Sequence, residues 1–197
     1  FRKSIANDNR IEVLNSFCEN NNNNLINRVI KNKKSSFYEI QHVKARYQSE
    51  IDFFDNKNSI IVDKSNPIFI NKGEINDEKN VLKIINKNPD LLICYGSSLI
   101  KSRLLEIFRN KFINVHLGLS PYYRGTGTNV WPLINNEPGM VGATFMHIDS
   151  GIDTGEIIHQ VRADIFLGDS PHTIGNRLII KMTQNYINLI TNFKFIP

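Results

Sequence analysis

Three polar residues that could do chemistry together lie in one segment of this sequence, residues 112–155. Asn114 and His116 stand two positions apart in an otherwise apolar run, and Asp153 lies between the glycines of residues 151–155. An amide can donate to a developing oxyanion, an imidazole can donate or shuttle a proton, and a carboxylate can orient the imidazole. Together these side chains would suit acyl transfer.

No nucleophile for such a reaction has a local signature in the sequence. There is no Gly-x-Ser-x-Gly pattern, and neither Cys18 nor Cys94 stands beside a basic residue. Attack would therefore come from a bound substrate. The sequence also leaves two candidates for the carboxylate. Asp149 lies four residues before Asp153, and spacing does not choose between them.

These residues also have simpler interpretations that involve no catalysis. Asn114 and His116 could satisfy loop backbone groups at the end of a strand, and Asp153 could be an ordinary turn aspartate. A metal site built from His116, His147, Asp149 and Asp153 is disfavoured, since no His-x-x-x-His or comparable ligand spacing is present. We therefore expect no bound metal.

The loop that follows His116 holds two candidate substrate contacts, Arg124 and Gly125. The Gly-Thr-Gly-Thr stretch at residues 125–128 could cradle a phosphate through backbone amides, but a flexible turn is the stronger interpretation of so short a loop. Arg124 could clamp a carboxylate or phosphate, or form a surface ion pair.

Asn114 and His116 must be positioned by a strand at residues 112–116, which would place both side chains on one face. Pro121 marks the end of this strand, and ligands of open α/β sheets bind outside the carboxyl ends of strands. Residues 91–95 form a uniformly apolar strand, as is typical of buried parallel sheets. The polar pair would thus lie where a ligand binds.

Strands and helices alternate along the rest of the chain. We predict strands at residues 11–18, 60–62, 142–148 and 156–161, and helices at residues 35–54, 75–85, 99–108, 129–136 and from Ser170 onward. This order implies an α/β protein with a single doubly wound, mostly parallel sheet. No internal repeat is visible, and residues 1–197 are expected to form one domain.

The composition is typical of a globular protein, with 41% hydrophobic and 22% charged residues among 197. A net charge of +5 suits small anionic substrates, but the basic residues are scattered, which disfavours nucleic-acid binding. No apolar run is long enough to span a bilayer and no signal-like start is visible, so we expect a cytoplasmic protein without a membrane partner. Cys18 and Cys94 lie in apolar contexts and are interpreted as small buried hydrophobes.

Several motifs, in this order, closely resemble the formyltransferase family that uses 10-formyltetrahydrofolate. This family includes methionyl-tRNA, glycinamide ribonucleotide and sugar N-formyltransferases and formyltetrahydrofolate hydrolases. The motifs span somewhat over a third of the chain. They are Asn88-Pro89-Asp90-Leu91-Leu92, Gly96, Asn114-Val115-His116, Pro121-Tyr122-Tyr123-Arg124-Gly125, Val141-Gly142-Ala143-Thr144 and Gly151-Ile152-Asp153-Thr154-Gly155.

The resemblance implies a Rossmann-like formyltransferase domain with 10-formyltetrahydrofolate as cosubstrate. The family's catalytic asparagine, histidine and aspartate correspond to Asn114, His116 and Asp153. In the implied mechanism a substrate amine attacks the formyl carbon, Asn114 and protonated His116 stabilise the oxyanion, and Asp153 orients His116 and relays the proton. The pterin ring would lie in an apolar slot between two loops, which involves Tyr95, Leu99, Ile100, Ile148, Asp149 and Ile152.

This sequence also departs from the family pattern. Gly118-Leu119-Ser120-Pro121 stands where the family usually has Ser-Leu-Leu-Pro. The family's first strand has no counterpart before Phe1, so we expect a sheet that lacks it, with an exposed edge that could pair in a homodimer. Nor is there a counterpart after Pro197 of the carboxyl-terminal domain of tRNA formyltransferases, which disfavours tRNA as the acceptor.

Three functions follow as hypotheses. The leading one is an N-formyltransferase acting on a primary amine of a small molecule, such as an amino sugar attached to a nucleotide. A 10-formyltetrahydrofolate hydrolase would use the same three residues, with water in place of the amine and formate as product. The third is a non-catalytic folate-binding or partner-binding remnant.

Overall fold

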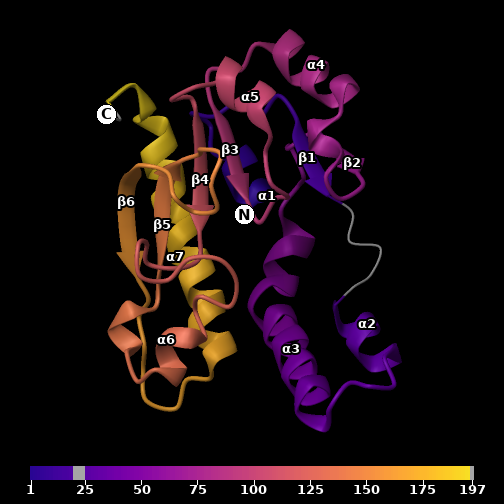
Figure 1. Ribbon diagram of the computed structural model, residues 1–197, viewed down its shortest axis with the longest axis vertical. Coiled ribbons are helices and arrows are strands. Elements are labelled where there is room, and N and C mark those ends of the chain that lie inside the picture. The colour runs from indigo at the N-terminus through magenta and orange to yellow at the C-terminus, as the bar shows by residue number, and fades with distance from the viewer. Residues whose placement is uncertain (20–24, 196–197) are drawn as a thin grey trace.

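The computed structural model describes residues 1–19 and 25–195, and its larger sheet contains four strands (Figure 1). Their order across the sheet is β3-β4-β5-β6. β3 and β4 run parallel, while β5 is antiparallel to both β4 and β6. The four strands are Leu92–Tyr95, Phe112–His116, Gly142–His147 and Ile157–Arg162.

A second, smaller sheet pairs β1 (Ser16–Glu19) with β2 (Pro67–Ile70) in parallel. The α/β class is confirmed, but the single, mostly parallel sheet is corrected to two sheets in which two of the four strand pairings are antiparallel. The antiparallel return of β6 has a local cause. Residues 148–156 between β5 and β6 contain no helix, and parallel strands need a crossover connection that is usually helical.

The strand expected at residues 60–62 is wrong. Helix α3 (Phe37–Ile60) includes the first of these residues, and the strand that follows is β2, which begins only at Pro67. Three apolar residues are too few for their periodicity to distinguish a strand from the end of a helix. The strand expected at residues 11–18 is likewise shorter, because β1 begins only at Ser16.

One apolar core covers a face of the four-stranded sheet and a second packs on the other face at β3 and β4, so helices flank both sides as expected. Helix α7 (Pro171–Thr191) lies behind the sheet in Figure 1 and packs on one face. The hydroxyl of the fully buried Tyr186 donates to the Ile113 carbonyl at 2.7 Å and ties this helix to β4. Helices α4 (Glu78–Lys87) and α5 (Ser102–Ile107) contribute to the core on the other face.

The remaining helices lie outside these two cores or border them. Helix α3 packs against α7 and α2. No helix within residues 1–19 and 25–195 has the length and apolarity needed to cross a bilayer. The short elements are α1 (Arg2–Ala6), α2 (Leu25–Lys31), α6 (Trp131–Ile134) and the 3₁₀ helices Glu74–Asn76, Pro138–Met140 and Phe193–Phe195.

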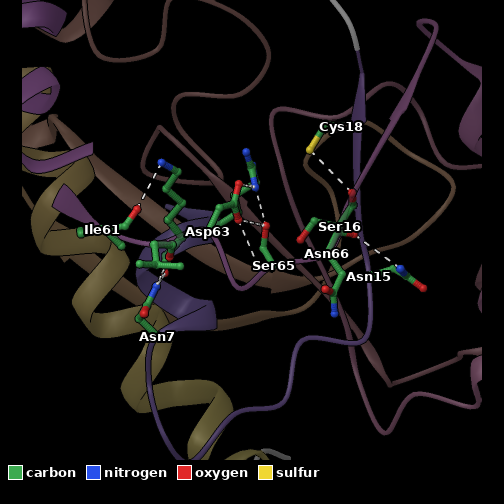
Figure 2. A network of polar contacts seen from close by, with 11 residues as sticks. Asn7, Asn15, Ser16, Cys18, Ile61, Asp63, Ser65 and Asn66 are labelled. Atoms are coloured by element: carbon green, nitrogen blue, oxygen red, sulfur yellow. Dashed lines mark hydrogen bonds and ion pairs between the residues drawn. The ribbon is translucent and has the colours of Figure 1, made fainter. Parts of the chain in front are cut away.

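Polar contacts attach the loop before β2 to the amino-terminal segment (Figure 2). The Asn7 amide donates to the Val62 carbonyl at 2.8 Å. The Arg2 guanidinium binds both the Asp63 carboxylate and the Ser65 hydroxyl. The Ser65 hydroxyl also donates to Asp63, and this hydrogen bond together with Arg2 lowers the pKa of Asp63 to about 2.

The two sheets are separated by a cavity of about 1450 Å³ lined by residues of both β1 and β3. Within the described chain, β1 pairs only with β2 and β3 only with β4. Glu19, at the end of β1, bridges the gap by accepting from the Ser98 amide at 3.0 Å and from the Gly73 amide at 2.8 Å. The departure from the expected single sheet therefore lies between β1 and β3.

Candidate active site

Asn114, His116 and Asp153 converge at the carboxyl end of β4. The Asn114 Nδ2 group donates to Asp153 Oδ1 at 3.3 Å, and His116 Nδ1 lies 3.2 Å from Asp153 Oδ2. The side chains of His116 and Asp153 are only 8% and 13% exposed. The alternation of side chains along β4 explains why Asn114 and His116 share a face, as the sequence predicted.

Asp153 reaches this position because the turn that carries it is tightly closed. Its φ of +52° is left-handed, a conformation that aspartate tolerates better than most residues. A Cβ on Gly155 would lie 1.7 Å from the His147 carbonyl oxygen, so only glycine fits there. Asp149, the other candidate, instead accepts from the Thr154 hydroxyl at 2.8 Å and from the Gly151 amide at 2.9 Å. Asp153 is therefore the carboxylate that faces His116.

Both ring nitrogens of His116 face oxygen acceptors. Nε2 lies 3.0 Å from the Tyr123 carbonyl oxygen, which can only accept, so Nε2 carries a hydrogen. Nδ1 faces the carboxylate of Asp153. The imidazolium form is the one in which both nitrogens donate. The loop that supplies the Tyr123 carbonyl thus helps to fix the orientation of the ring.

Gly118 and Thr144 hold that loop against His116. A Cβ on Gly118 would lie 2.4 Å from His116 Nε2 and 2.5 Å from the Tyr123 carbonyl oxygen. The buried Thr144 hydroxyl donates to the Gly118 carbonyl at 2.7 Å and accepts from the Ser120 amide at 3.0 Å. Gln160 donates to the same hydroxyl, also at 3.0 Å.

Sequence reasoning did not assign a role to Thr144, although one signal was available. Thr144 lies within residues 141–144, one of the motifs of the family resemblance. It is also the direct partner of His116 across the antiparallel pair of β4 and β5. Its position beside His116 follows from this strand pairing, which the sequence alone does not reveal.

Cys94 contacts the other end of the Asn114 amide. The two residues are paired across β3 and β4, and Cys94 Sγ lies 3.2 Å from Asn114 Oδ1. The sequence identified Cys94 only as a small buried hydrophobe. Its position beside Asn114 depends on the register of the two strands, which the apolar run at residues 91–95 does not reveal.

The residues expected to bind the cofactor occupy different environments. Ile100 is buried, and Ile148 packs against the same core cluster. Leu99 and Ile152 are 56% and 67% exposed. The Tyr95 ring packs against Phe1 and the core on the α7 side, so only its backbone could reach a ligand near Asn114.

The expected substrate residues lie at the rim of the site. Arg124 is exposed, and the Gly125 amide donates to Asp153 Oδ2 at 3.1 Å. Further along the same loop, a Cβ on Gly127 would lie 3.2 Å from Nε1 of Trp131, which is 53% exposed. In the part of the chain that the structure describes, no group of three or more His, Cys, Asp or Glu side chains could hold a metal ion.

The model of the formyl transferase family matches residues 5–190 of this chain. The chain belongs to the formyl transferase family. The matched region contains both sheets and all three residues that converge at the candidate active site.

Curated members of the family share substantial identity with part of the chain. Methionyl-tRNA formyltransferase of Thermodesulfovibrio yellowstonii is 33% identical over 61% of this chain and 39% of its own length. The enzyme of the same name from Geobacter metallireducens is 42% identical over 50% of this chain and 32% of its own. The aligned region thus spans about two fifths or less of these relatives.

Solved structures of family members share the fold. Phosphoribosylglycinamide formyltransferase from Anaplasma phagocytophilum aligns with a TM-score of 0.57 at 19% identity, covering 66% of this chain and 65% of its own. The formyltransferase PseJ from Anoxybacillus kamchatkensis aligns with a TM-score of 0.54 at 25% identity, covering 76% and 74%. That structure contains UDP-4,6-dideoxy-4-formamido-L-AltNAc and tetrahydrofolate.

Proposed function

We propose that this domain is an N-formyltransferase that moves a formyl group from 10-formyltetrahydrofolate to a primary amine of a small molecule. The observation that carries the proposal is the convergence of Asn114, His116 and Asp153, with separations of 3.2 and 3.3 Å to the same carboxylate. An amide donor, an imidazolium and a carboxylate are the groups needed for transfer to an amine that is itself the nucleophile.

Each residue has a separate task. Asn114 Nδ2 carries two hydrogens, of which one is directed to Asp153, so the other remains to donate to the oxygen on which negative charge develops. His116, held by the Tyr123 carbonyl and Asp153, adds positive charge beside that oxygen. Asp153 orients His116 and takes up the proton that the attacking amine must lose. This proton would pass to the folate nitrogen that leaves when its bond to the formyl carbon breaks.

The surroundings suit a folate, which supplies an activated formyl carbon when bound. The exposed apolar side chains of Leu99 and Ile152 would contact the flat pterin ring, and Ile100 and Ile148 lie in the core beneath these loops. Apolar walls with a few polar groups are typical of sites for small planar ligands. Asp149 contributes by closing the turn that carries Ile152.

The acceptor class that we favour is an amino sugar attached to a nucleotide. The likeness to PseJ, whose structure contains a formamido sugar nucleotide, supports this class. Arg124 is exposed beside Gly125, which contacts Asp153, so its guanidinium is available to a phosphate at the rim. A net charge of +5 would also favour an anionic acceptor.

The test follows the release of tetrahydrofolate from 10-formyltetrahydrofolate by absorbance. Acceptors are a UDP-4-amino-4,6-dideoxy sugar, glycinamide ribonucleotide and methionyl-tRNA, with one reaction lacking any amine. We expect release that depends on the amino sugar and that falls about a hundredfold or more in Asn114→Ala, with folding intact. Asn86→Ala, which removes the same side chain from an exposed position of α4, is the matched control.

Other outcomes would overturn the proposal in identifiable ways. Release without any amine would identify a hydrolase, and formylation of methionyl-tRNA alone would exclude a small-molecule acceptor. Binding of the folate without release under any condition would identify a non-catalytic domain. Full activity in Asn114→Ala would remove the assigned role of that amide.

A further inference from the structure

Cys94 lies directly beside Asn114 on the neighbouring strand. The two residues are partners in the parallel register of β3 and β4, which directs their side chains to the same face. Cys94 Sγ is 3.2 Å from Asn114 Oδ1, within hydrogen-bond distance for sulfur. A thiol is a weak donor and an amide oxygen is an acceptor, so the S–H group points at Oδ1.

The opposite end of the same amide faces Asp153, to which Nδ2 donates at 3.3 Å. The two ends of a side-chain amide are nearly identical in shape, so half a turn would exchange the oxygen and the NH₂ group. That turn would place Oδ1 against the Asp153 carboxylate and remove the N–H donor from the reaction. Cys94 and Asp153 therefore favour the same orientation from opposite ends.

We propose that Cys94 is a positioning residue that keeps the Asn114 amide in its donating orientation during formyl transfer. This inference rests on the proposed function. When Asp153 takes up the proton of the amine it becomes a carboxylic acid, which donates as well as accepts, so it no longer selects the N–H end of Asn114. The Cys94 thiol does not change its charge in that step and still selects the orientation.

The ionisation of Cys94 supports this role. Cys94 as a residue is partly exposed where it lines the cavity between β1 and β3, but its thiol is desolvated. Burial raises the pKa of the thiol to about 12, against an opposing hydrogen bond from Ser97. Cys94 therefore keeps its proton, and with it the ability to donate, from acidic to mildly alkaline pH.

Two substitutions separate the hydrogen bond from the volume of the side chain. Cys94→Val has no donor, and we expect its kcat to fall about threefold to tenfold with KM for 10-formyltetrahydrofolate unchanged. Cys94→Ser restores a donor and should stay within about twofold of the wild type. The control is Cys18→Val, because the Cys18 thiol belongs to the other sheet, where it contacts the Ser16 carbonyl at 3.6 Å. Equal kcat in Cys94→Val and Cys94→Ser would overturn the proposal.

A double-mutant cycle shows whether Cys94 acts through Asn114. Added to Asn114→Ala, Cys94→Val should cause no further fall in kcat, because the amide to be positioned is gone. A merely structural role would lower kcat in both backgrounds by the same factor. That additive result would overturn the positioning role even if Cys94→Val alone is slow.

A third measurement does not depend on activity. The chain has two cysteines, so Cys18→Ala leaves the S–H stretch of Cys94 as the one thiol signal in the infrared spectrum. We expect this stretch to move to higher frequency when Asn114→Ala removes the acceptor. An unchanged frequency would overturn the inference whatever the enzyme does. A shifted frequency in a protein without turnover would instead show that the contact exists and that the proposed function has failed.

Discussion

The half of the molecule built on β3 to β6, which carries Asn114 and His116, differs from the amino-terminal half, built on β1 and β2. The difference lies in the interactions that hold each half in place. Strands β3 to β6 form a continuous ladder with an apolar core on each face. Strands β1 and β2 are joined to them across a cavity by the Glu19 carboxylate, and the loop before β2 is anchored by Arg2 and Asp63. The first half depends on close packing, whereas the attachment of the second combines apolar contacts, such as those of Phe1 and Phe17, with charged hydrogen bonds.

The difference shows where this fold can hold a precise geometry. Close-packed interiors resist displacement of any one group, because each shift costs contacts on several sides. Charged hydrogen bonds near the surface weaken with salt and with protonation. The three convergent residues lie in the close-packed half. We therefore expect catalysis to respond to small steric changes there, and assembly of the two halves to respond to charge.

Among the variants that test this difference between the halves, the largest effect is expected from Gly118→Ala. The added Cβ would lie 2.4 Å from His116 Nε2 and 2.5 Å from a backbone oxygen, so His116 or the loop must move. We expect kcat to fall about tenfold or more. Gly139→Ala is the matched control, because a Cβ there meets nothing within 4 Å. Unchanged kcat in Gly118→Ala would show that the loop is not close-packed against His116.

Thr144→Val preserves the shape of a buried side chain and removes its hydroxyl. The Ser120 amide and the Gly118 carbonyl would lose their partner. Unsatisfied buried groups should lower the free energy of unfolding by about 1–3 kcal/mol. Thermal unfolding, compared with that of Thr126→Val at an exposed threonine of the loop that follows β4, measures the effect. Equal stability of the two variants would contradict the importance of this network.

Glu19→Gln tests the connection between the halves. Glutamine retains one acceptor oxygen but loses the charge that strengthens the bonds to Ser98 and Gly73. We expect a loss of about 1 kcal/mol, seen as faster hydrogen exchange at these two amides with little change in kcat. Glu12→Gln, on an exposed side chain, is the control. A large fall in kcat would show that the halves are not separable.

The smallest effect concerns acid stability. The Ser65 hydroxyl and Arg2 lower the pKa of Asp63 from 3.8 to about 2, so its contribution to stability is complete above the ordinary value and is lost as the pH falls toward 2. Asp63→Asn should therefore unfold less steeply with falling pH than the wild type does. Asp55→Asn, an exposed aspartate of α3, should retain the wild-type slope. Parallel acid-unfolding curves for Asp63→Asn and the wild type would contradict this assignment.

The sequence predicted the parts of the site that depend on local pattern. Alternation along residues 112–116 predicted that Asn114 and His116 share a face, and the turn at residues 151–155 supplied a carboxylate. Which carboxylate faces His116 depends on tertiary contacts, namely the closure of Gly155 on His147 and the use of Asp149 within its own turn. Spacing could not provide this information.

Features that depend on register or on chain pairing were not predictable from one sequence. The contact of Cys94 with Asn114 follows from the pairing of β3 with β4, and the position of Thr144 follows from the pairing of β4 with β5. The four residues of β2 are too few for a period to be recognised. The catalytic, cofactor-binding and substrate-binding roles assigned to the site remain predictions.

Trp131 gives the protein a natural optical reporter. It is the one tryptophan in the sequence, it is half exposed, and it borders Gly127 in the loop that leads back to Gly125 and Asp153. The emission of an indole depends on its contact with water, so a ligand that orders or covers this loop would change the fluorescence. Ligand binding at the rim of the candidate active site could thus be followed by fluorescence titration of the unlabelled protein.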